Sequence, residues 1–147
     1  MSKTFAGYHV VFCTKHRKRT LTFEERKSLY KYIYETLKQN GCHVYRINGM
    51  DEHIHIAFDL NPMVALAILI KDLKQFSSLW LKRNEKFPVF EGWQEGYYAH
   101  TFSYKDKDSV IKYITDQQVH HKDFMLFQEM QHIAERNGLT WFPDDWT

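Results

Sequence analysis

The chain has 147 residues, a formal net charge of +2 at pH 7 and two cysteines. Its length fits one domain with a sizeable core, and a hydrophobic fraction of 44% with an aromatic fraction of 16% excludes an intrinsically disordered chain. Two cysteines make no disulfide framework, and no apolar run reaches the length of a membrane span. We expect one intracellular domain over residues 1–147, in which local patches and not bulk charge would hold any nucleic acid.

The first predicted strand covers residues 8–14, which are rich in aromatic and β-branched side chains and apolar on both faces. A basic loop with Lys15, Arg17, Lys18 and Arg19 follows directly. Such a loop is as often a solvated turn as a binding site, but several cations at one strand end also suit DNA phosphates. A helix is then predicted from the Thr-x-x-Glu capping box at 22–25 to the glycine at position 41.

Residues 43–48 and 53–58 predict a hairpin of two strands. Because side chains alternate along a strand, His53 and His55 share one face while the isoleucines between and after them point to the other. Two converging imidazoles supply the first two ligands of a metal site. An isolated His-x-His is more often the solvated face of a strand, so its neighbours decide between the two interpretations.

Asn61-Pro62 predicts the start of a second helix, whose apolar stripe repeats at three and four residues from Leu66 to Trp80. Lys74 and Ser77 are expected on its outer face. A charged outer face is usually just solvated, but these residues also suit backbone phosphates. Residues 93–103 predict the last strand of a core that covers residues 5–104.

The order of these elements is strand, helix, strand, strand, helix, strand. It predicts an α+β, ferredoxin-like (split βαβ) fold, with an antiparallel sheet and two helices on one face. The first and third strands are then central, which sets the histidine pair in the middle of the face that the two helices leave open.

A further helix is predicted at about residues 107–121, followed by a C-terminal helix and tail over residues 123–147. Tyr113 falls at the edge of the apolar arc of the first of these helices, and Gln117 follows one turn later on the same flank. Alone, Tyr113 would be an ordinary boundary residue of an amphipathic helix. Together with the histidine pair, that interpretation is no longer the favoured one.

The pair His53 and His55 on a third strand, followed by Tyr113 and Gln117 on a later helix, resembles the single-tyrosine HUH transposases of small bacterial insertion sequences and their REP-associated relatives. The similarity extends over nearly the whole chain. It includes residues 8–15, 74–78, Trp93 and 96–97. Asp51 and Glu52 depart from the family pattern, in which a proline and an aspartate often precede the histidines.

This resemblance implies an enzyme that cleaves and rejoins single-stranded DNA at hairpins that mark element ends. Tyr113 would be the nucleophile and would become joined to a 5′ phosphate, while His53, His55 and the amide oxygen of Gln117 would hold Mg²⁺ or Mn²⁺. Imidazole ligands suit manganese somewhat better than magnesium. The resemblance also implies a homodimer in a bacterial cytoplasm. The expected DNA contacts are Lys15, Arg17, Lys18, Arg19, Lys74 and Ser77.

Two other functions stay open from the residues alone. A non-catalytic module that binds single-stranded nucleic acid could use the same fold, but it gives the histidine pair, Gln117 and Tyr113 no role. A metal-dependent nuclease that uses water would make Tyr113 dispensable. The general base is not identified by any pattern, and His100 and His120 are the candidates.

Overall fold

A computed structural model, which describes residues 1–120 and 125–142, contains a four-stranded antiparallel sheet with the order β2-β3-β1-β4. The strands are β1 (Gly7–Cys13), β2 (His43–Gly49), β3 (His53–Asp59) and β4 (Tyr98–Phe102). The helices are α1 (Arg26–Gln39), α2 (Leu66–Arg83), α3 (Lys107–Thr115), α4 (Gln117–His120) and α5 (Leu126–Arg136), with short 3-10 turns η1 (Lys15–Arg17) and η2 (Tyr104–Asp106).

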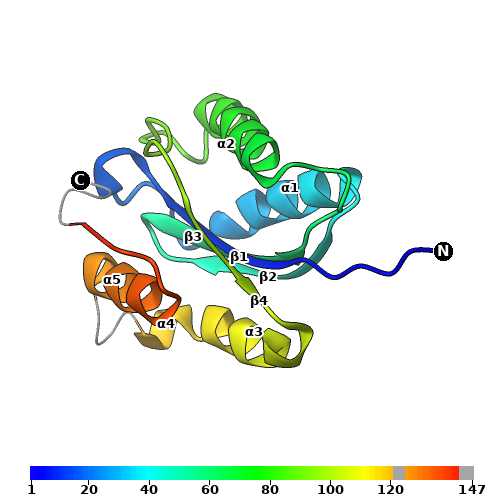
Figure 1. Cartoon of the computed structure of the whole chain (residues 1–147). Helices are drawn as coiled ribbons and strands as arrows, with labels where there is room; N and C mark the ends of the chain where they lie inside the picture. The colour runs from blue at the N-terminus through cyan, green and yellow to red at the C-terminus, as the bar shows by residue number, and fades with distance from the viewer. Residues whose placement is uncertain (121–124, 143–147) are drawn as a thin grey trace.

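The predicted α+β, ferredoxin-like fold is confirmed. β1 and β3 are the central pair, and α1 and α2 lie together on one face of the sheet (Figure 1). Strand alternation explains the core on this side, because the even-numbered residues of β1 and β3 point towards the two helices. Val10, Phe12, Ile54, Ile56 and Phe58 are fully buried there.

The expectation that the other face of the sheet is open was wrong. α3, α4 and α5 lie across it (Figure 1). Leu126, Met130 and Ile133 of α5 pack with Val11 and Tyr98 in a second buried cluster. The physical reason is that this face also carries apolar side chains, and α5 has an apolar stripe at helical spacing that covers them.

Several element boundaries differ from the prediction. Residues 22–25 form a turn ahead of α1, without a side-chain cap, and α1 begins at Arg26. The long helix predicted at 107–121 is interrupted at Asp116, which separates α3 from α4. The last strand is shorter than predicted, because only an isolated bridge between Thr14 and Trp93 precedes Tyr98.

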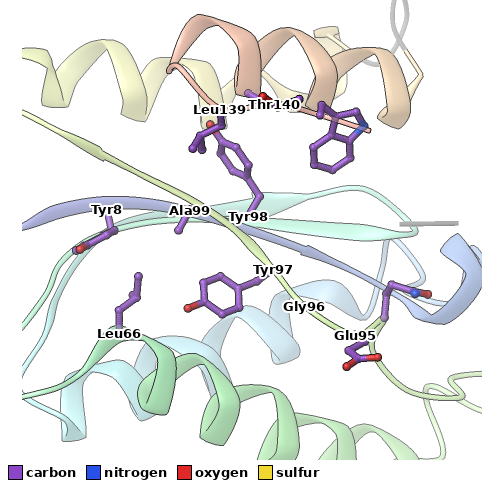
Figure 2. Close-up of a pocket in the computed structure, with 12 residues that line it drawn as sticks. Tyr8, Leu66, Glu95, Gly96, Tyr97, Tyr98, Ala99, Leu139 and Thr140 are labelled. Atoms are coloured by element: carbon purple, nitrogen blue, oxygen red, sulfur yellow. The ribbon is translucent and has the colours of Figure 1, made fainter. Parts of the chain in front are cut away.

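A pocket of about 780 Å³ runs along β4 and the segment that leads into it (Figure 2). Tyr97 and Leu66 line the side of the pocket near α2, while Leu139 and Thr140 line the side near the end of α5. None of the histidines on the sheet lines this pocket. Within the described residues, no helix is long and apolar enough to cross a membrane.

Candidate metal and tyrosine site

His53 and His55 lie on the face of β3 that α5 covers, and neither side chain is exposed. Their ring centroids are 5.0 Å apart. Strand register places His53 opposite Cys13 and His55 opposite Val11. The alternation of β3 therefore produces the predicted convergence, but in a buried position and not on an open surface.

The Nε2 atoms of the two histidines point towards the same acceptors. His53 Nε2 lies 3.1 Å from Gln117 Oε1 and 3.5 Å from Glu129 Oε1. His55 Nε2 lies 2.8 Å from the same Glu129 oxygen. The structure thus brings Gln117 to the histidine pair and adds a carboxylate from α5.

Glu129 was missed by the sequence analysis. Its side chain is almost fully buried on α5, in the same helical face as Leu126, Met130 and Ile133. An acidic residue within an otherwise apolar helical stripe was the available signal, since a buried carboxylate needs a partner. Its meaning depended on where α5 packs, which the periodicity of the helix did not specify.

The donor set fits a divalent metal ion. The ligand atoms of His53, His55 and Glu129 lie within 4.8 Å of one another. Gln117 Nε2 is buried without a hydrogen-bond partner in the described part of the chain, while its Oε1 faces His53. Two imidazoles with carboxylate and amide oxygens are ligands that Mn²⁺ accepts readily and Mg²⁺ accepts less readily.

Tyr113 on α3 reaches this cluster within its own chain. Its ring centroid is 5.9 Å from that of His55, and Gln117 and Glu129 lie near enough to its hydroxyl to shift its pKa. Burial, together with the negative charge of Glu129, raises the pKa of Tyr113. The tyrosine is therefore a phenol at neutral pH, and an attack by its oxygen needs a proton acceptor.

The interruption between α3 and α4 is held by β2. The side-chain amide of Asn48 donates to the carbonyl oxygens of Ile114 at 2.9 Å and Thr115 at 3.2 Å. In return, Gln118 Nε2 donates to the Gly49 carbonyl at 3.0 Å. These bonds satisfy carbonyls at the end of α3 and fix the position from which Gln117 points inward.

A carboxylate orients the outer nitrogen of His53. Glu52 Oε1 lies 2.6 Å from His53 Nδ1. Burial lowers the pKa of His53, but the hydrogen bonds with Glu129 and Glu52 outweigh it and raise the pKa to about 9. Without a metal, His53 is therefore protonated at neutral pH, and a metal ion must displace that proton.

The orienting partner of His55 is another histidine. His55 Nδ1 lies 2.8 Å from Nε2 of His9, a β1 residue that is 3% exposed. Burial lowers the pKa of His9 well below its ordinary value, and the neighbouring His55 and His100 lower it further. His100 itself hydrogen-bonds with the Tyr98 hydroxyl, and burial lowers the pKa of His100 to about 4. The side chain of His120 lies outside the described residues.

The basic loop after β1 is exposed at Lys15, Arg17, Lys18 and Arg19. Lys18 makes an ion pair with Glu91 at 2.9 Å. Arg19 Nε lies 4.0 Å from a Glu52 oxygen, so the loop is adjacent to the carboxylate that orients His53.

Lys74 and Ser77 of α2, which were expected to contact DNA from its outer face, differ in how far they are buried. Ser77 is fully buried, and its hydroxyl accepts a hydrogen bond from the Trp93 indole at 3.0 Å. Its expected position on the outer face was wrong, because the buried stripe of α2 includes Leu69, Leu73 and Ser77. Lys74 is half-buried and donates to the carbonyl oxygens at positions 94 and 96, at 2.7 and 2.6 Å.

Known proteins resemble this chain in sequence. Residues 2–117 match the family model described as "Transposase IS200 like". The chain is 27% identical over 115 residues to the ISDra2 transposase TnpA of Deinococcus radiodurans, a match that covers 75% of this chain and 82% of the relative. It is 25% identical over 115 residues to the transposase of insertion sequence element IS200 from Salmonella typhimurium, with 75% of each covered.

Two solved structures share the fold. A structure from Deinococcus radiodurans assigned as a transposase has a TM-score of 0.58 and 23% identity, over 80% of this chain and 95% of that one. A REP-associated tyrosine transposase bound to a REP hairpin has a TM-score of 0.61 and 17% identity, over 100% of this chain and 92% of that one. The family match ends at residue 117, so it includes Tyr113 and Gln117 but not α5.

Proposed function

The chain belongs to the family of IS200-like transposases, and from this we propose that it cleaves and rejoins single-stranded DNA at hairpins through a bond between Tyr113 and a 5′ phosphate. Membership of the family makes it a DNA-cleaving enzyme. One observation carries the finer proposal: the Tyr113 ring lies 5.9 Å from that of His55, and the Nε2 atoms of His53 and His55 face Gln117 and Glu129, the two side chains that also influence the Tyr113 hydroxyl.

We propose that His53, His55, Gln117 and Glu129 together hold Mn²⁺ or Mg²⁺. When bound, the ion would neutralise charge on the scissile phosphate and orient it for in-line attack. Glu129 contributes the negative charge of the ligand set, and Glu52 holds the ring of His53 from its other side. An outer carboxylate of this kind fixes the tautomer and orientation of a histidine ligand.

The chemical step exchanges one ester bond for another. The Tyr113 oxygen attacks phosphorus and forms the tyrosine ester, while the bond from phosphorus to the 3′ oxygen breaks and that oxygen leaves with the electron pair. The Glu129 carboxylate, whose charge acts on the Tyr113 hydroxyl, would accept the tyrosine proton, and the 3′ oxygen takes a proton to become a hydroxyl. The reverse reaction rejoins DNA, and it needs no ATP because the tyrosine ester retains the phosphodiester energy.

DNA access requires a movement in the protein. His53, His55 and Gln117 have no exposed surface, so a phosphate reaches them only when α3–α4 or α5 shifts. The exposed side chains of Lys15, Arg17 and Arg19 lie at the end of β1, beside the strand that carries the histidines. We propose that this loop holds the DNA backbone near the site, and that hairpin recognition and a homodimer complete the active form.

A covalent adduct on hairpin-bearing single-stranded DNA tests the proposal. The protein is incubated with this DNA and Mn²⁺, and the adduct is separated on a denaturing gel. Tyr113→Phe should bind the DNA but form no adduct, while Tyr104→Phe, at an exposed tyrosine ahead of α3, should form it normally. Cleavage that survives Tyr113→Phe would indicate a nuclease that uses water. Binding without any cleavage by the unaltered protein would indicate a non-catalytic module.

A further inference from the structure

We propose that His9 is a positioning residue for His55: it accepts a hydrogen bond from His55 Nδ1 and so directs His55 Nε2 to the metal. His9 would do for His55 what Glu52 does for His53, but with a neutral ring in place of a carboxylate. This inference rests on the metal site of the proposed function and adds a residue outside the ligand set.

The geometry of the two rings supports this role. His9 Nε2 lies 2.8 Å from His55 Nδ1, and on the opposite edge of the same ring His55 Nε2 lies 2.8 Å from Glu129 Oε1. The register of β1 and β3 places Val11 opposite His55, so that His9 is its diagonal neighbour on the same face of the sheet. Both side chains are buried, at 3% and 0% exposure.

A histidine that binds a metal through Nε2 carries its remaining proton on Nδ1. In a buried site that N–H needs an acceptor, since an unpaired buried donor is destabilising. His9 Nε2 is at hydrogen-bond distance to accept it. His9 is itself held in place, because its ring packs edge-on against those of His100, at 4.9 Å, and Tyr113, at 6.0 Å.

The neutrality of His9 matters for the charge of the site. The two carboxylates Glu52 and Glu129 already balance the charge of one divalent ion. A third carboxylate beneath His55 would make the site negative and would repel the scissile phosphate. A neutral acceptor at position 9 orients His55 without that repulsion.

The affinity of the DNA-free, full-length protein for Mn²⁺, measured by titration calorimetry, tests this role. His9→Leu removes the acceptor and should weaken Mn²⁺ binding by about 10- to 100-fold, the usual effect of losing such an outer partner. His9→Gln keeps a neutral acceptor and should recover most of that loss. His43→Leu is the control, because His43 is an exposed histidine of β2 whose ring packs on Tyr45 and not on His9, and it should change the affinity by less than about twofold.

Two further measurements separate positioning from a general structural effect. Nitrogen-15 NMR of the unaltered protein with Mg²⁺ should show His55 protonated at Nδ1. His9→Asp should bind Mn²⁺ at least as tightly as the unaltered protein and yet form less DNA adduct.

A folded His9→Leu variant with unchanged Mn²⁺ affinity would overturn the inference and leave the metal site standing. If that variant does not fold, an unprotonated Nδ1 on His55 in the NMR experiment would overturn it instead. Failure of the unaltered protein to bind Mn²⁺ or Mg²⁺ would refute the metal site itself, and the inference with it.

Discussion

Replacing Glu129 by glutamine should destabilise the metal-free protein in a pH-dependent way. The substitution keeps the size of the side chain but removes a buried negative charge from between His53 and His55. Glu129 and Glu52 together raise the pKa of the fully buried His53 to about 9, against an ordinary value of 6.5. Protonated His53 thus stabilises the folded chain, and Glu129 contributes more than Glu52 to raising its pKa.

The size of the effect follows from linkage between protonation and folding. Each unit of pKa difference corresponds to about 1.4 kcal/mol, so the shift of His53 amounts to roughly 3 kcal/mol when fully expressed. Because Glu52 supplies part of the pKa shift, Glu129→Gln should lower the free energy of unfolding by about 1–2 kcal/mol. For a raised histidine pKa, this stabilisation is complete below pH 6.5 and is lost as pH rises through about 9.

Urea unfolding in the presence of a chelator, at pH 6 and pH 9.5, measures the difference. Glu129→Gln should lower the free energy of unfolding at pH 6 and have a much smaller effect at pH 9.5. Glu135→Gln, at an exposed position of the same helix, is the control and should have little effect at either pH. Equal losses at both pH values for Glu129→Gln would refute the reasoning, since they would indicate a packing defect and not a charge interaction.

Three other predictions follow from the site. Mn²⁺ affinity should rise about tenfold per pH unit between pH 6.5 and 8.5, because binding displaces the proton of His53, whose pKa is about 9; calorimetry showing a flat profile would contradict this. Asn48→Ala should lower the free energy of unfolding, measured in urea, by about 1–2 kcal/mol and should reduce the adduct yield, because it leaves the carbonyls at the α3–α4 interruption without their donor. Unchanged stability and yield would show that β2 does not hold Gln117 in place. Arg17→Gln and Arg19→Gln should each reduce the magnitude of the slope of log affinity for single-stranded DNA against log salt by about 0.7. Ser77→Ala, at a buried position, should leave that slope unchanged. The reverse pattern would indicate that DNA binds along α2 and not at the basic loop.

Much of the fold could be predicted from local patterns. The alternation along residues 53–58 and the spacing of helices and strands were sufficient for the sheet order, because the split βαβ pattern permits few arrangements. The prediction failed for a residue that could lie on either the buried or the exposed face of its helix. Serine is a residue type usually found facing solvent, yet the position of Ser77 in the helical turn places it against the Trp93 indole. Burial at that point depends on what α2 packs against.

The sequence by itself determined which side chains act together locally: His53 and His55 share a face because of the two-residue period of a strand, and Tyr113 and Gln117 lie one helical turn apart. Only the tertiary structure decided that α5 covers this face, that Glu129 contacts His55, 74 positions away in the chain, and that His9 lies at hydrogen-bond distance from the other ring nitrogen of His55. Periodicity specifies the direction of a side chain relative to its own element. The partner that it meets depends on which apolar surfaces pack together, and that is a property of the whole chain.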